Sequence, residues 1–141
     1  MYELLDAIHI VNRWLLIPVM IVVIILALKG IFTKGSFGKL DNALGGTMVG
    51  LAHLQLVIGL VLLYLRDWDL QYRIIDKLNP EAKGISTIEH VTVGIVGVLL
   101  IQLGRTLGKK APNAESRHKK VAIFTIIAAL LIISRQPHWH F

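Results

Sequence analysis

The 141-residue chain contains no cysteine. This absence excludes disulfides, thiolate-bound zinc, cysteine-ligated iron–sulfur clusters and covalent attachment of a c-type haem. The motifs of common catalytic sites are missing as well, because the sequence holds no nucleophile–base motif, phosphate-binding loop or HExxH motif. A stand-alone enzyme is therefore not expected.

Charged residues are scarce and apolar residues abundant. The chain is 17% charged and 55% hydrophobic, and its mean hydropathy of +0.65 is well above that of a soluble domain. The net charge of +6 does not indicate nucleic-acid binding, because the basic residues cluster in loops between apolar runs. The N-terminus has no basic leader or small-residue cleavage site, so we interpret it as mature protein rather than a signal peptide.

Four apolar runs predict four helices in a single domain spanning residues 1–141. The expected helices cover about residues 5–29, 42–66, 86–107 and 115–136. Each is near the length needed to cross a bilayer core of about 30 Å, and flanking Lys and Arg side chains can snorkel. Short connections after the first and third helices favour an antiparallel arrangement. We therefore expect an all-α integral membrane protein built as an antiparallel up-down four-helix transmembrane bundle.

The charges in the loops predict an orientation. The loops after the first and third helices are basic, whereas the connection at residues 66–83 is charge-balanced and has the pattern of a short interfacial helix. Under the positive-inside rule, the two basic loops lie in the cytoplasm. Both termini are then expected on the non-cytoplasmic side of the membrane.

The third run begins with a histidine that stands above two glycines. One face of this helix carries His90, Gly94, Gly97, Ile101 and Arg105. Gly94 and Gly97 would leave room for a flat, bulky group such as a porphyrin beside the His90 imidazole. The alternative is that both glycines only allow another helix to approach closely, as small residues commonly do in membranes.

Histidines inside membrane segments are costly to bury and are candidates for function. Measured against the flanking charges, His9 and His90 lie in the outer half, on helices one and three. His53 and His118 lie in the inner half, on helices two and four. Because each pair sits on diagonal helices of an antiparallel bundle, the pattern predicts two bis-histidine haems stacked across the membrane.

Other arrangements of the histidines stay open. A single central haem between His53 and His90 is the main competing geometry, since the levels within each predicted pair differ by about 7 Å. His118 could instead be an exposed loop residue. An outer copper or zinc site could use the side chains of His9, His90, His138 and His140. That site ranks below haem because it leaves His53 unexplained.

Four basic residues lie near the ends of the predicted pairs and could bind haem propionates: Arg13, Arg105, Lys119 and Arg135. The alternative for each arginine is interfacial anchoring. Glu89, next to His90, could accept a proton from a quinol or simply place a negative charge at the start of its helix.

Several motifs together carry a resemblance. They are His9-Ile-Val-Asn-Arg13-Trp14, Ala52-His53 followed by Ile58-Gly59-Leu60, Glu89-His90, Gly104-Arg105 and His118-Lys119. In this order and over nearly its whole length, the chain resembles a small bacterial four-helix membrane family usually labelled cytochrome b. It is more distantly similar to the transmembrane di-haem cytochromes b. The resemblance implies non-covalent b-type haem on the four helix histidines and a location in the bacterial inner membrane.

We therefore expect a membrane b-type cytochrome that carries electrons across or along the membrane, as an electron-transfer protein or an oxidoreductase subunit. Two haems b are expected, with one as the alternative. Expected partners are the lipid bilayer and a quinone or a respiratory redox complex, and both homo- and hetero-oligomers stay open. Two other functions stay open: a non-redox membrane subunit or scaffold, and a histidine-based metal or proton transporter. The lack of an internal repeat counts against the transporter.

Overall fold

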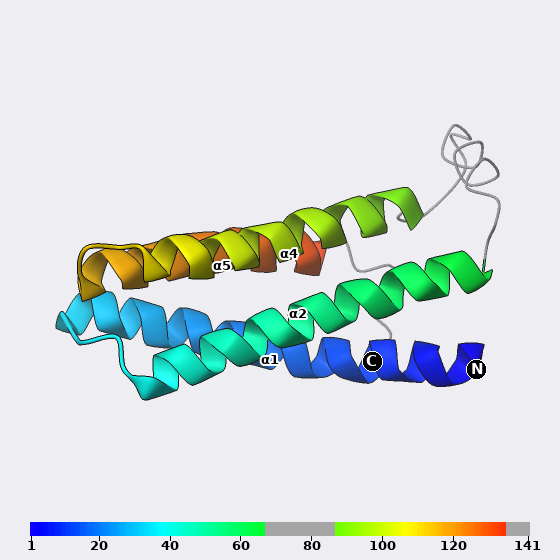
Figure 1. The fold of residues 1–141 in the computed structure, drawn as a ribbon, viewed down its shortest axis with the longest axis horizontal. Helices are drawn as coiled ribbons and strands as arrows, with labels where there is room; N and C mark the ends of the chain where they lie inside the picture. The colour runs from blue at the N-terminus through cyan, green and yellow to red at the C-terminus, as the bar shows by residue number, and fades with distance from the viewer. Residues whose placement is uncertain (67–86, 135–141) are drawn as a thin grey trace.

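The computed structural model describes residues 1–66 and 87–134, where all regular structure is helical. The helices are α1 (Tyr2–Thr33), α2 (Lys39–Arg66), α4 (Thr87–Lys109) and α5 (Ala114–Ser134). They lie lengthwise beside one another (Figure 1), with α1 packed on α2 and α5, and α4 packed on α2 and α5. Within the described residues, α1 is therefore diagonal to α4, and α2 to α5. For residues 1–66 and 87–134, the prediction of an all-α structure with four helices is confirmed.

The helix ends are close to those expected, with one larger difference. The C-terminal end of α1 was expected near residue 29, but the helix continues through Gly30 to Thr33. It ends where Lys34 adopts a left-handed conformation (φ 53°) and the amide of Gly35 donates to the carbonyl of Gly30 at 3.1 Å. Gly30 therefore belongs to the last turns of α1, and the chain reverses after it.

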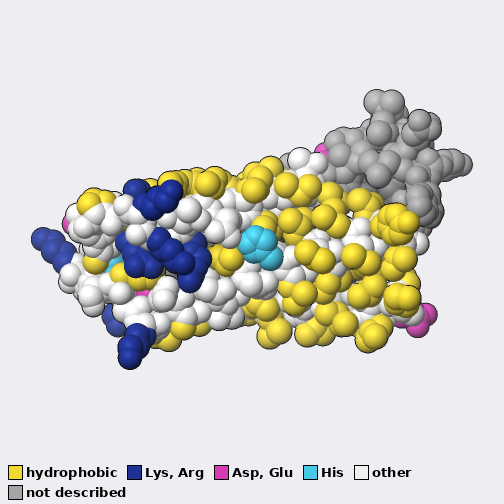
Figure 2. All heavy atoms as spheres, viewed as in Figure 1, with side chains coloured by type: hydrophobic (Ala, Val, Ile, Leu, Met, Phe, Trp, Pro, Cys, Tyr) yellow, Lys and Arg dark blue, Asp and Glu magenta, His cyan; other side chains and the backbone are white. Residues whose placement is uncertain are grey.

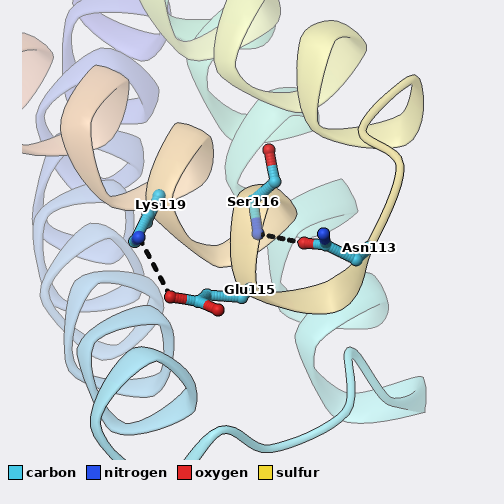
Figure 3. Close-up of polar contacts among 4 residues, drawn as sticks. All are labelled: Asn113, Glu115, Ser116 and Lys119. Carbon is cyan, nitrogen blue, oxygen red and sulfur yellow. Dashed lines mark hydrogen bonds and ion pairs between the residues drawn. The ribbon is translucent and has the colours of Figure 1, made fainter.

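The start of α5 is capped as its sequence suggests. The Asn113 side-chain oxygen accepts a hydrogen bond from the backbone amide of Ser116 at 2.8 Å (Figure 3). One turn further, the Lys119 ammonium lies 3.0 Å from the Glu115 carboxylate, and its hydrogen bond holds the pKa of that exposed carboxylate below its ordinary value. The observed start at Ala114 agrees with the helix expected from about residue 115.

Three of the described helices are long and apolar enough to cross a membrane: residues Tyr2–Thr33, Lys39–Leu65 and Glu89–Lys109. The described part of α5 is not among them, because four of its first seven residues are charged. The apolar stretch that follows, residues 121–133, is about 20 Å long, shorter than a bilayer core of about 30 Å. Of the four predicted spans, three therefore correspond to described helices that are long and apolar enough to cross a membrane. Residues 67–83 and 135–136, which carried the predicted interfacial helix and the end of the fourth span, lie outside the described residues.

Small residues lie at the closest helix contacts of the bundle, and many large apolar side chains are exposed. Ala27, Ala52 and Ala128 are almost fully buried where the helices meet. In contrast, Val57 and Leu130 are more than half exposed, and apolar side chains cover much of the face in Figure 2. Close contacts through small residues and a wide apolar exterior are typical of helices that pack within lipid.

One end of the bundle is strongly basic. The α1–α2 and α4–α5 connections lie together at this end, opposite the N-terminus (Figure 1), and Lys and Arg side chains gather there (Figure 2). We call this the basic end and define it by Lys29, Lys34, Lys39, Arg105, Lys109, Lys110, Arg117, Lys119 and Lys120. Among the described residues near these connections, Asp41 and Glu115 are the acids. This asymmetry is the pattern on which the predicted orientation rests.

Candidate functional site

The His9 and His90 rings meet between two diagonal helices, toward the end away from the basic end. Their centroids are 6.4 Å apart and their planes are inclined by 73°. Both side chains are half-buried. Because α1 and α4 do not pack directly against one another in the described structure, the two rings can meet only by pointing into the bundle. The structure thus brings together the predicted outer pair.

A buried amide network holds the His9 ring on one side. The Asn12 amide donates to the carbonyl of Leu51 at 3.0 Å and to the Gln55 side-chain oxygen at 2.6 Å. The Gln55 nitrogen then lies 3.1 Å from His9 Nε2. Asn12 is only 3% exposed, and a buried amide is costly unless hydrogen-bonded. The network therefore ties α1 to α2 directly beside His9.

The contact with Gln55 decides which His9 nitrogen is engaged. The Gln55 nitrogen can only donate, so Nε2 of His9 is the acceptor. His9 Nδ1 is buried and has no hydrogen-bond partner among the described residues. One ring nitrogen of His9 is therefore held, and the other is left unsatisfied in the bundle.

Sequence reasoning missed Asn12 and Gln55. A signal for them existed, since both are uncharged polar residues in otherwise apolar runs, and Asn12 lies on the same face of α1 as His9, one turn away. Polar residues within a predicted span merit the same attention as ionisable ones, because each needs a partner there.

The glycines near the pair serve different purposes. A Cβ on Gly59 of α2 would lie 3.1 Å from the His9 ring, so this position keeps space for the imidazole. A Cβ on Gly97 would lie 2.8 Å from the Ile132 side chain, so Gly97 allows α4 and α5 to approach closely. Gly94 has no neighbouring atom within 4 Å of a Cβ position. The close-packing interpretation is therefore confirmed for Gly97, whereas open space adjoins Gly94, one turn after His90.

His53 and His118, the predicted inner pair, are not brought together. Asn12 bonds to α2 at Leu51, close to His53, whereas His118 packs against Gly30 at the other end of α1. Asn12 and Gly30 are five turns apart on α1, or about 27 Å. Along the bundle axis, α2 and α5 therefore place these two histidines at different levels, whereas the flanking charges had predicted similar levels.

His53 lies on the outside of the bundle. Its side chain is exposed, and its Nδ1 donates to the carbonyl of Val49, one turn earlier in α2, at 2.8 Å. The His53 ring is thus hydrogen-bonded within its own helix through Nδ1.

His118 is enclosed, contrary to the alternative of an exposed loop residue, which is wrong. It is 1% exposed, and a Cβ on Gly30 would overlap its ring. Its Nε2 lies 3.3 Å from the Ser36 carbonyl, and the Phe37 ring is 5.1 Å away between centroids. His118 Nδ1 is buried without a partner. The described contacts make His118 a packing residue between α5, α1 and the α1–α2 connection.

The predicted propionate-binding residues fall in different places. Arg13 is one turn from His9, and its guanidinium carbon lies 5.7 Å from the Trp14 ring centroid. Arg105 is about 22 Å from His90 along α4, and it hydrogen-bonds Asn42. Lys119 pairs with Glu115, as described above, and Arg135 lies outside the described residues. Arg13 is therefore the predicted cation within reach of a group held at His9 and His90.

The residues at the outer pair fit a bis-histidine cofactor. Two metal–nitrogen bonds of about 2.1 Å plus two imidazole radii span about 6 Å, close to the observed 6.4 Å between centroids. His9 Nδ1 would ligate a metal in the other tautomer, with the ring proton on Nε2 and the Gln55 amide turned so that its oxygen accepts that proton. Within residues 1–66 and 87–134, no cluster of three or more His, Cys, Asp or Glu could hold a bare metal ion. His138 and His140, needed for the predicted copper or zinc site, lie outside these residues.

The fold and the site define a four-helix protein with three candidate membrane spans and a paired-histidine centre. Comparison of the chain with protein-family models, with curated proteins and with solved structures finds no match. The resemblance to the cytochrome b family therefore stays an expectation, and the functional argument rests on the geometry.

Proposed function

We propose that this chain is an integral membrane protein of the bacterial inner membrane that binds haem b between His9 and His90 and transfers electrons. In this proposal the helices form an antiparallel up-down bundle, with both termini on the non-cytoplasmic side. Support for insertion comes from the three apolar helices, the apolar exterior and the basic end.

The single observation that carries the haem proposal is the His9–His90 ring pair, 6.4 Å apart on diagonal helices. Two imidazoles facing across a bundle core are the usual ligand set of membrane b-type cytochromes. Haem bound in this way supplies one-electron redox chemistry with no open iron position, which favours electron transfer over oxygen binding.

The surrounding residues orient the ligands. Gln55 lies on one nitrogen of His9, and with its amide turned so that the oxygen accepts from Nε2–H it would act as the outer-shell group that directs a ligating ring. The space at Gly94 would accept part of a flat ring beside His90. Arg13 is placed to pair with a carboxylate at this level.

We propose one haem per chain rather than two. The predicted inner ligands are separated by about 27 Å along the bundle, and each is accommodated by its own surroundings. The roles of His53 and His118 as ligands remain predictions, but the geometry favours the outer pair alone.

The first test is a reduced-minus-oxidised optical spectrum of the detergent-purified full chain, with haem counted per chain. We expect a b-type signal at about one haem, which His9→Ala and His90→Ala abolish. Loss of a ligand should lower the affinity for haem by more than the about 10–100-fold that is typical when an outer-shell partner is removed. His53→Ala and His118→Ala are the matched controls and should keep the signal. A colourless protein from haem-replete cells, or loss of haem in both controls, would contradict the proposal.

One observation favours a second function, a non-redox membrane subunit. The network from Asn12 through Gln55 to His9 joins α1 to α2 by side-chain hydrogen bonds. In that case the histidines act as interhelical hydrogen-bonding groups. The same spectrum separates the two functions, because only the cytochrome is coloured. The transporter alternative stays a prediction.

A further inference from the structure

A small cavity opens at the basic end, among α2, α4, α5 and the α1–α2 connection. Two guanidinium groups from different helices line it: Arg105 from α4 and Arg117 from α5. Met48 and Val121, both buried, are among its apolar lining residues. The lining therefore combines two guanidinium groups with apolar side chains.

The Arg105 side chain is held in place against α2. Its guanidinium donates to the Asn42 carbonyl at 3.2 Å and to the Asn42 side-chain oxygen at 3.3 Å. A Cβ on Gly45 would lie 3.0 Å from the same guanidinium, so the glycine leaves room for it. These two bonds use two of the five N–H donors of an arginine. Arg105 is thus positioned in advance and keeps donors for a further acceptor.

Arg117 is oriented by an aromatic ring. Its guanidinium carbon lies 3.7 Å from the Phe37 ring centroid, a stacking distance. Stacking orients the guanidinium plane and leaves its N–H groups pointing outward from the edges. In the described part of the chain, neither Arg105 nor Arg117 forms an ion pair with a carboxylate. Both guanidinium charges are therefore uncompensated by direct pairing.

The local charge suits a monoanion. Asp41 also lines the cavity, where its carboxylate accepts a hydrogen bond from the Gly38 amide at 2.9 Å. Two guanidinium groups and one carboxylate leave one net positive charge in the lining. A phosphodiester carries one negative charge, whereas inorganic phosphate approaches two at neutral pH. The Asp41 charge thus disfavours the free ion relative to a diester.

We propose that this cavity binds the phosphodiester of an anionic membrane phospholipid. The planar donors of two arginines match phosphate oxygens. The basic end borders the wide apolar surface in Figure 2, which would accept the acyl chains. Basic pockets between membrane helices on the cytoplasmic side are suited to such headgroups. The proposal rests on membrane insertion in the proposed function, and it is independent of haem.

The test uses native mass spectrometry of the full chain in detergent, with added phosphatidylglycerol or phosphatidylcholine of identical acyl chains. We expect the wild type to retain phosphatidylglycerol in preference to phosphatidylcholine. The double variant Arg105→Gln, Arg117→Gln should retain phosphatidylglycerol about tenfold less. The matched control Lys109→Gln, Lys110→Gln removes the same charge from the same end outside the cavity, and should stay within about twofold of the wild type.

Because Arg105 also joins α4 to α2, Arg117→Gln alone serves as a second variant, and helical content by circular dichroism verifies folding. Equal losses in both double variants would overturn the proposal in favour of general charge attraction. Equal retention of the two lipids would overturn headgroup selection. Displacement of phosphatidylglycerol by excess inorganic phosphate would identify a free-anion site instead. The haem spectrum of the same samples is a separate readout, so failure of the haem proposal leaves this result interpretable.

Discussion

At the scale of the residue, the position of His9 depends on neighbours from two other helices. Gln55 and Gly59 of α2 and His90 of α4 all approach its ring. The network engages His9 Nε2, whereas His9 Nδ1 is buried and forms no hydrogen bond with the described residues. A histidine in this setting is restrained before any ligand binds, which lowers the entropic cost of metal ligation.

Replacement of Gln55 tests this restraint. Gln55→Leu keeps the approximate volume but removes the partner of His9 Nε2 and of the Asn12 amide. We expect a loss of about 1–3 kcal/mol in the free energy of unfolding, since buried polar groups lose their partners. Thermal unfolding in detergent, followed by circular dichroism, measures it.

Gln102→Leu is the matched control. The Gln102 nitrogen donates to the Thr106 hydroxyl at 3.0 Å, a bond within α4 alone. Its loss should cost less than about 0.5 kcal/mol. Similar losses in both variants would show that the Gln55 network contributes no more than an ordinary bond within one helix.

At the scale of the element, contacts between helices assign different tasks to glycines that look alike in the sequence. Gly30 lies where α1 receives the His118 ring of α5, whereas Gly50 of α2 faces no atom within 4 Å of a Cβ position. Both are interior helix positions at which alanine has the better intrinsic helix propensity. The neighbouring helix therefore decides whether a glycine-to-alanine substitution raises or lowers stability.

Gly30→Ala and Gly50→Ala form a matched pair that tests the α1–α5 contact. The added methyl at position 30 would overlap the His118 ring, so we expect a loss of about 1–3 kcal/mol in stability. At position 50 the same change meets open space and should raise stability by up to about 1 kcal/mol. Thermal unfolding midpoints of the two variants measure both effects. If Gly30→Ala left the unfolding midpoint unchanged, the His118 ring would not pack against Gly30 as described.

At the scale of the whole molecule, apolar and basic surfaces are segregated. The basic end holds most of the described Lys and Arg residues, and the rest of the visible face is largely apolar (Figure 2). In a membrane this distribution would place the α1–α2 and α4–α5 connections in the cytoplasm. The cavity to which we assign a phospholipid headgroup lies at this basic end.

The lack of cysteine makes the orientation directly measurable. Lys110→Cys places a single thiol in the α4–α5 connection, and Glu3→Cys places one near the N-terminus. A membrane-impermeant maleimide should label the first only in inside-out vesicles and the second only in right-side-out vesicles. Cysteine-free wild type is the control for background. Labelling of both thiols from the same side would contradict the proposed topology.

Much of the fold followed from local signals in the chain. The four helices, the capped start of α5 near Asn113 and the basic connections were predictable, because hydropathy and capping act over a few residues. The length of α1 was underestimated because Gly30, normally a stop signal, is used for packing against His118. Among the candidate ligands, only the meeting of His9 and His90 was predicted in the form observed.

The sequence by itself determined that this protein is helical and concentrates positive charge in two connections. It predicted four apolar runs near the length of a bilayer core, and three of the described helices are long and apolar enough to cross a membrane. The tertiary structure alone decided that His53 faces outward, that His118 is enclosed beside Gly30, and that Asn12 and Gln55 join His9. The physical reason is that hydropathy is a property of each segment. In contrast, the axial offset and rotation of each helix depend on how side chains from all its neighbours pack together.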